Sequence, residues 1–189
     1  MSVKAFRWCR SITVLALAIL MSGCASGART GCMTMSVTAD TIVSESSPLH
    51  STIKIGTVTG GKETNPLWKS NVSNENFRQA LEQSLSLETM ITSKEPRYLI
   101  NADLIDLDQP FVGTSMTVTA RVHYTVVGNS DQDMKLDETV VTPYTAKFSD
   151  SFLGVERLRL ANEGAIRENI HAMIVKLIAA SQPGQPLSQ

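Results

Sequence analysis

Apolar and polar side chains alternate without a break from residue 116 to residue 126, and this pattern constrains the fold more than any other. The apolar set is Met116, Val118, Ala120, Val122, Tyr124 and Val126, and the polar set is Thr117, Thr119, Arg121, His123 and Thr125. Successive side chains of a β-strand point to opposite faces, so one face should be buried and the other solvated. The chain is therefore expected to build a sheet that is covered on one side and exposes a Thr-rich surface on the other.

Four further segments have a β pattern. Apolar side chains alternate in 33–39, 98–104 and 140–148, and the run 52–58 is rich in β-branched residues. The polar loop 128–133 has the composition of a hairpin turn, so the strand after it should return antiparallel. Pro143 lacks the N–H that a central strand would donate, which predicts an edge position for the returning strand.

A first helix is predicted after Ser73, a residue type that caps helix N-termini. Val72 and Phe77 occupy the two positions of a hydrophobic staple across this cap. Apolar residues then follow at helical spacing, and Pro96 excludes continuation of the helix.

A second helix is predicted over about 155–180, with Leu158 and Leu177 in its buried stripe. Gly164 inside it should weaken the helix by roughly 1 kcal/mol relative to Ala. The order of these elements predicts one α+β domain, a four- or five-stranded antiparallel sheet with two helices packed on one face.

The first 24 residues follow a different pattern. Lys4, Arg7 and Arg10 form a basic region without acids, and Ile12–Leu20 is a short apolar run that leads to Cys24. That run is far shorter than the roughly 20 residues of a transmembrane helix and is typical of a signal peptide.

The segment Leu20-Met21-Ser22-Gly23-Cys24 resembles the lipobox of bacterial lipoproteins, although Met21 stands where Leu is usual. The resemblance implies cleavage before Cys24 and lipid on its thiol, and two or three acyl chains anchor a protein stably. In that family an Asp after the cysteine marks inner-membrane retention, so Ala25 implies the outer membrane, with the domain facing the periplasm. We expect a signal peptide over 1–23, a lipidated N-terminus and short tether over 24–32, one periplasmic domain over 33–181 and a flexible tail over 182–189.

Charge excludes one class of partner. The chain has 17 basic and 18 acidic residues, and loss of the three basic residues of the signal leaves 14 against 18. Nucleic-acid-binding proteins usually carry a clustered basic surface, and here Lys and Arg are scattered, so no nucleic-acid partner is expected. Cys32 becomes a single additional thiol in an oxidising compartment, where it is either buried or forms a dimer between chains.

The stretch Gly56–Lys62 satisfies the G-x-x-x-x-G-K part of a phosphate-binding loop. Glu63 replaces the hydroxyl residue that would bind Mg²⁺, and the capped helix starts too late to present its N–H groups to phosphate. We therefore expect a turn at the end of a strand and no nucleotide.

Other constellations also favour structural roles. Asp106 and Asp108 should share one strand face while Asp103 points away, and a charged strand end is favoured over calcium. The three histidines, His50, His123 and His171, lack the spacing of a zinc site, and no G-x-S-x-G elbow is present. No metal, cofactor or catalytic residue is expected.

At the level of element order over about residues 50–180, the domain is similar to small envelope-assembly lipoproteins. These are the lipopolysaccharide-assembly lipoprotein and the lipoprotein activators of peptidoglycan synthases, and the likeness assigns no site residue. We expect a non-catalytic accessory or scaffold protein, with Thr117, Thr119, Arg121 and His123 as its candidate partner face. The competing hypotheses are a lipid- or glycan-binding module, which would need a large apolar cavity, and a hydrolase.

Overall fold

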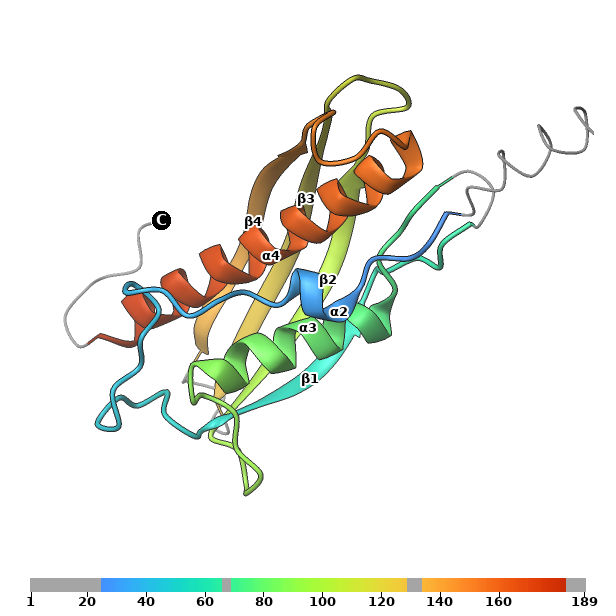
Figure 1. Cartoon of the computed structure of the whole chain (residues 1–189). Helices are drawn as coiled ribbons and strands as arrows, with labels where there is room; N and C mark the ends of the chain where they lie inside the picture. Colours follow the sequence, from blue (N-terminus) through green and yellow to red (C-terminus); the bar gives the residue numbers. More distant parts are fainter. Residues whose placement is uncertain (1–24, 66–68, 129–133, 183–189) are drawn as a thin grey trace, which may run out of the picture.

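Four strands form one sheet in the order β1-β2-β3-β4, and helices cover one of its faces (Figure 1). The computed structural model describes residues 25–65, 69–128 and 134–182. Its elements are α2 (Thr30–Met33), β1 (Ile53–Thr59), α3 (Asn74–Leu87), β2 (Tyr98–Asp108), β3 (Met116–Gly128), β4 (Met134–Ala146) and α4 (Gly154–Ser181). The predicted α+β class and the placement of both long helices on one face are confirmed.

The sheet is mixed, and the expectation of a wholly antiparallel sheet is wrong at its first pair. β1 and β2 run parallel, whereas β2–β3 and β3–β4 are antiparallel. The physical reason is the connection, because α3 carries the chain back across the sheet before β2 starts, and such crossovers join parallel strands. β4 is an edge strand, as Pro143 predicted.

The alternating segment is the centre of the sheet. All of the predicted inward residues of β3 are buried, and Val118, Ala120, Val122, Tyr124 and Val126 have no exposed surface. They pack under α4, which lies across β3 and β4, while α3 covers β1. One continuous core therefore joins the sheet and the helical layer.

The first long helix has the predicted cap and stripe. The Ser73 hydroxyl accepts a hydrogen bond from the Asn76 N–H at 3.2 Å, and both staple residues, Val72 and Phe77, are fully buried. The buried stripe consists of Phe77, Ala80, Leu81, Ser84 and Leu85. Local pattern and packing agree throughout this element.

The segment before β1 differs from its prediction. Residues 33–39 form no strand, because the main chain there bonds to a helix instead of a sheet edge: the Met35 N–H donates to the Ser84 hydroxyl at 3.1 Å. Met33 and Met35 are buried, but Val37 is 49% exposed, so the apparent alternation does not continue. α2 lies between α3 and α4 and contacts both (Figure 1).

The packed domain starts earlier in the chain than predicted, and the last strand ends before its predicted end. Ala28 is 1% exposed and belongs to the hydrophobic core, and Ser26 is hydrogen-bonded to Ser70, so the expected tether is attached to the domain from Ser26 onward. β4 stops at Ala146 because a turn follows, in which the Lys147 N–H donates to the Asp150 carboxylate at 2.8 Å.

Among the described helices, none has both the length and the apolar character to cross a bilayer.

Candidate functional site: the anchor end and the outer sheet face

Cys24, the predicted lipidation site, lies outside the described residues, but the chain that follows it is fixed on the domain. The carbonyl of Ser26 accepts a hydrogen bond from the Ser70 hydroxyl at 2.8 Å. The Ala28 N–H donates to the Asn71 carbonyl at 3.0 Å, and the Ala28 carbonyl accepts from the Asn76 amide at 2.9 Å. Two separate segments therefore hold residues 26–28 in place.

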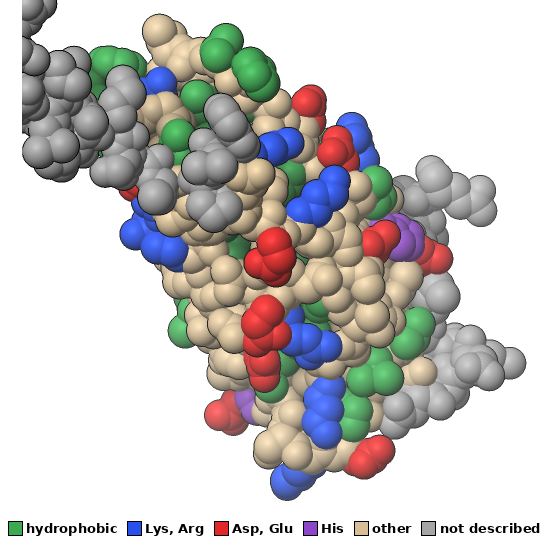
Figure 2. All heavy atoms as spheres, turned by 90° about the vertical axis from the view of Figure 1, so that its right-hand side faces the viewer, with side chains coloured by type: hydrophobic (Ala, Val, Ile, Leu, Met, Phe, Trp, Pro, Cys, Tyr) green, Lys and Arg blue, Asp and Glu red, His purple; other side chains and the backbone are tan. Residues whose placement is uncertain are grey.

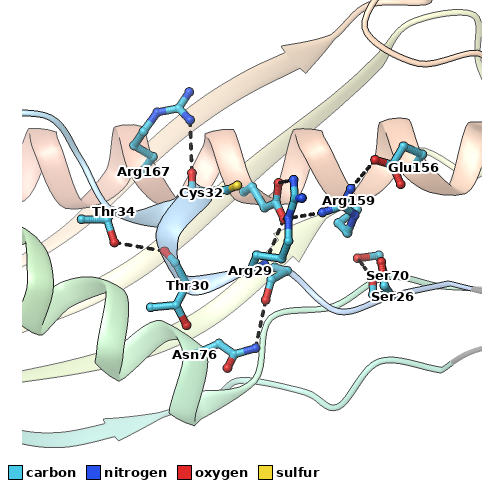
Figure 3. A network of polar contacts seen from close by, with 12 residues as sticks. Ser26, Arg29, Thr30, Cys32, Thr34, Ser70, Asn76, Glu156, Arg159 and Arg167 are labelled. Carbon is cyan, nitrogen blue, oxygen red and sulfur yellow. Dashed lines mark hydrogen bonds and ion pairs between the residues drawn. The ribbon is translucent and has the colours of Figure 1, made fainter.

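A buried ionic network fixes the next residue (Figure 3). The main-chain N–H and the Nε of Arg29 donate to Glu163 Oε1 at 2.9 and 3.1 Å, and this carboxylate raises the pKa of Arg29 above its ordinary value. The same oxygen accepts from Arg159 Nη1 at 2.9 Å, and Arg159 also pairs with Glu156. Because Glu163 and Arg159 are 2% and 5% exposed, water screens the pairing of these charges only weakly.

A second polar cluster shows which end of the domain this is. The Asn162 amide on α4 donates to the Ser70 carbonyl at 2.9 Å, and Gln109, just after β2, donates to the same carbonyl and to the Asn162 oxygen at 3.1 and 2.7 Å. Two hydrogen bonds thus connect Ser26 through Ser70 to Gln109. We call this end, where β1, β2 and β4 finish and α4 begins, the anchor end; it comprises residues 25–29, 60–65, 69–72, 109–115 and 147–153.

Sequence reasoning missed these buried polar residues. Arg157, Arg159, Asn162, Glu163 and Asn169 are all buried on α4, although the sequence predicted an apolar stripe there. Their place in the sequence is the signal that could have revealed them, because charged and amide residues lie among the apolar stripe residues between Leu158 and Ile170. Helical spacing alone does not identify their partners, most of which lie at least 27 positions away or in the same helix, while Arg157 also bonds to Ser151 just before the helix.

The candidate partner face is brought together as expected, on the side of the sheet that the helices leave uncovered. Thr117, Thr119, Arg121 and His123 lie on the outward side of β3, and each is partly or largely exposed. Most are engaged across the strands: Thr117 with Thr145 at 2.8 Å between hydroxyls, Arg121 with Asp106 at 3.7 Å, and His123 with Thr139 and Asp137 at 3.3 and 3.2 Å. The face is therefore a row of paired polar groups.

The three aspartates of β2 lie on that same outer face, and the prediction that Asp103 points away is wrong. The register shifts between Leu104 and Asp106, where Ile105 is an extra residue in β2. This bulge reverses the alternation, so that Asp103, Asp106 and Asp108 stand opposite the outward residues His123, Arg121 and Thr119. Among the described residues, no group of His, Cys, Asp and Glu is arranged to hold a metal.

The phosphate-loop match falls on a strand. Gly56 to Thr59 belong to β1, and a Cβ on Gly56 would stand 2.2 Å from the Asn101 side-chain oxygen, which accepts from the Thr57 N–H at 2.8 Å. Gly60 has a φ of 81° and turns the chain at the strand end. α3 begins only at Asn74. The prediction that the helix starts too late after Lys62 to present its N–H groups to phosphate is therefore confirmed.

The histidine environments differ from a hydrolytic triad. His171 Nε2 lies 3.3 Å from the Asp40 carboxylate, which is 56% exposed, and 3.2 Å from the Thr38 hydroxyl. Hydrogen bonds from Thr38 and from the Asp40 N–H, together with His171, lower the pKa of Asp40. The partner of His123, Asp137, is 52% exposed. In neither pair is the aspartate buried, as the aspartate of a hydrolytic triad is.

Two large surface hollows in the described part of the chain have walls of mixed polar and apolar character. One of about 590 Å³ lies over α3 and is lined by Thr34, Gln79, Glu82, Gln83, Ser86 and Leu87. Another of about 560 Å³ runs beside α4 and includes Cys32, Glu163 and Arg167. Both hollows are open to solvent, so neither is the large enclosed apolar cavity that a lipid-binding module would need.

The sequence matches no family model, and no curated protein matches it. Solved structures with a similar fold include a Xanthomonas campestris protein of family DUF330, with a TM-score of 0.54, 10% identity, and 78% of this chain and 93% of that chain covered. A candidate lipoprotein from Caulobacter crescentus matches with a TM-score of 0.46, 13% identity, and 69% and 93% coverage. A hypothetical protein from Chlamydia trachomatis matches with a TM-score of 0.47, 9% identity, and 69% and 99% coverage. The likeness to the Xanthomonas protein establishes the α+β fold alone.

Proposed function

We propose that this chain is a bacterial lipoprotein, anchored in the outer membrane through lipid on Cys24 and facing the periplasm. In this proposal its domain acts as a non-catalytic accessory or scaffold in envelope assembly or transport. The observation that carries the proposal is the attachment of Ser26 and Ala28, which closely follow the lipobox cysteine, to Ser70, Asn71 and Asn76 of the domain by hydrogen bonds. Lipid on Cys24 would therefore hold the anchor end against the bilayer instead of leaving the domain on a long tether.

The outer sheet face is the proposed partner surface. With the anchor end at the membrane, the strands point away from the bilayer, and their uncovered face remains accessible along its length. Its donors and acceptors are fixed by cross-strand pairs such as Thr117–Thr145 and Arg121–Asp106. A partner that binds ordered side chains loses little conformational entropy, which favours recognition here.

The anchor is tested by Cys24→Ala in cells fed a fatty-acid analogue. The variant should accumulate as an uncut precursor without label, because its thiol is the predicted acceptor of diacylglycerol. Cys32→Ser is the matched control and should keep both the label and the normal size. Label retained by Cys24→Ala would contradict the anchor assignment.

The partner face is tested by Thr119→Glu. Thr119 is at the centre of the face and partly exposed, so the variant should fold. Its new charge stands opposite Asp108, so its melting temperature should fall slightly, because like charges on paired strands repel, while its crosslinked partner in intact cells should be lost. Gln83→Glu makes the same charge change on the helical side, at an exposed position of α3, and should retain the partner. A folded Thr119→Glu protein that keeps its partner and complements a deletion strain would exclude this face.

A further inference from the structure

Two loops at the anchor end expose large apolar side chains. The loop after β2 carries Phe111 and Val112, which are 100% and 78% exposed, and the loop after β4 carries Phe148, Phe152 and Leu153, at 48%, 79% and 65%. We call these five residues the apolar tip. Single exposed apolar residues are common on soluble proteins, but several in adjacent loops mark an interaction surface.

One buried cation joins the two loops. Arg157, in the first turn of α4, is 5% exposed. Its guanidinium donates to the Ser151 carbonyl at 2.7 Å and to the Gly113 carbonyl at 2.9 Å, and it lies over the Phe148 ring at 5.2 Å from the centroid. Phe148 and Phe152 meet edge to face at 5.2 Å. The tip is therefore held in a defined arrangement before it meets any partner.

The apolar tip lies at the same end of the domain as the start of the described chain (Figure 1). Ser26 is joined through Ser70 to Gln109, two residues before Phe111. Figure 1 shows the N-terminal segment and both loops at the same upper right end of the domain, and Figure 2 shows hydrophobic side chains along the upper part of the molecule. Cys24 is two residues before Ser26 in the sequence, and two residues of extended chain span at most about 7 Å, so lipid on Cys24 would join the domain at this end.

Charges of both signs flank the tip in the described loops. The loops of the anchor end contain the basic residues Lys62, Lys69 and Lys147 and the acidic residues Glu63 and Asp150. Attraction to a strongly anionic surface is therefore not the main interaction expected of this end. The main interaction expected is apolar contact, because aromatic rings and short aliphatic side chains partition favourably into the headgroup region of a bilayer.

We propose that the apolar tip inserts into the interfacial layer of the same bilayer that holds the acyl chains of Cys24. This inference rests on the proposed lipid anchor and extends it. Lipid alone fixes one point and leaves the domain free to tilt, whereas lipid together with two inserted loops fixes its orientation. The outer sheet face would then be presented at a constant angle to the membrane.

The test uses the mature protein as cells process it, with Cys32→Ser and one new cysteine labelled with the environment-sensitive dye NBD, and mass spectrometry reports its acylation. Phe152→Cys and Phe111→Cys place the dye in either loop of the tip at exposed positions. Ile42→Cys is the matched control, because Ile42 is 66% exposed and follows Asp40, the partner of His171. His171 is 17 residues after Gly154 along α4, roughly 25 Å from the tip. Each protein is reconstituted into vesicles of phosphatidylethanolamine and phosphatidylglycerol.

In vesicles, NBD at 152 and 111 should shift to the blue and be quenched by doxyl-labelled lipids, while NBD at 42 should keep its emission in water. Water-like emission at both tip positions, in protein that floats with the vesicles, would overturn the tip proposal and leave the anchor intact. A blue shift that grows with protein concentration without vesicles would also overturn it, in favour of a second copy as the occupant. Protein that lacks acyl mass and does not float would overturn the anchor and the tip together.

Discussion

Glu163 is the residue on which the attachment of the N-terminal segment depends. Its carboxylate is 2% exposed and accepts from Arg29 and Arg159. A buried carboxylate is tolerated only when it is paired and hydrogen-bonded, and both conditions hold here. Arg29 in turn is placed by the lipobox-proximal chain, so one ion pair connects α4 to the start of the domain.

Glu163→Gln should destabilise the fold by about 2–4 kcal/mol, because it leaves the buried Arg159 beside Arg29 without the anion between them. The range is set below the roughly 3–5 kcal/mol for breaking a buried pair, since Arg29 is 57% exposed and Arg159 keeps Glu156. Urea unfolding measures the loss, and hydrogen exchange should show faster opening of residues 26–33 than of β3.

Glu168→Gln is the control for this change. Glu168 is 44% exposed and pairs with Arg167 at 3.7 Å on the surface, where an ion pair contributes about 0–1 kcal/mol. Equal urea midpoints for the two variants would mean that the buried network does not hold the N-terminal segment.

At the scale of the element, α4 has two structural roles, which its apolar and its polar residues perform separately. Its apolar side chains close the core over β3 and β4, and its polar residues connect the anchor end. Gly164 lies between them, and a Cβ at this position would stand 2.2 Å from the Tyr144 ring of β4. The sequence indicated only that this glycine weakens the helix, whereas the structure shows that it lets a strand approach closely.

Gly164→Ala should therefore lower stability by roughly 1–3 kcal/mol, as overpacking does, instead of raising it by the 1 kcal/mol of helix propensity. Gly31→Ala in α2 is the matched control, because nothing lies within 4 Å of its added Cβ, and it should be neutral or slightly stabilising. The urea midpoint at constant m value compares them. A gain in stability for Gly164→Ala would show that Tyr144 moves aside without cost.

At the scale of the whole molecule, the two proposed surfaces lie at different places and serve different contacts. The anchor end gathers the N-terminal segment, the ionic network of Glu163, the amide cluster of Asn162 and Gln109, and the apolar tip, whereas the partner face extends along the uncovered side of the sheet (Figure 1). Since the sheet and α4 are one packed body, an orientation fixed at the tip would be transmitted to the face. The proposals for the lipid anchor, the apolar tip and the scaffold role are therefore connected, and each has its own test.

The sequence by itself determined the local elements and their buried sides. The cap at Ser73, the stripe of α3, the alternation of β3 and the edge position of β4 were all predicted correctly, because each depends on a repeat of 2 or 3.6 residues or on the missing N–H of a proline. Such patterns say which face of an element is apolar. They do not say which other element covers it.

Only the tertiary structure decided the long-range pairings. It made β1 parallel to β2, placed Ile105 as a bulge that turned Asp103 to the outer face, and buried Glu163 against Arg29. It also packed the expected tether and brought the loops of Phe111 and Phe152 to one end. Each of these outcomes joins residues distant in sequence, and their energy comes from contacts that exist only after the chain has folded.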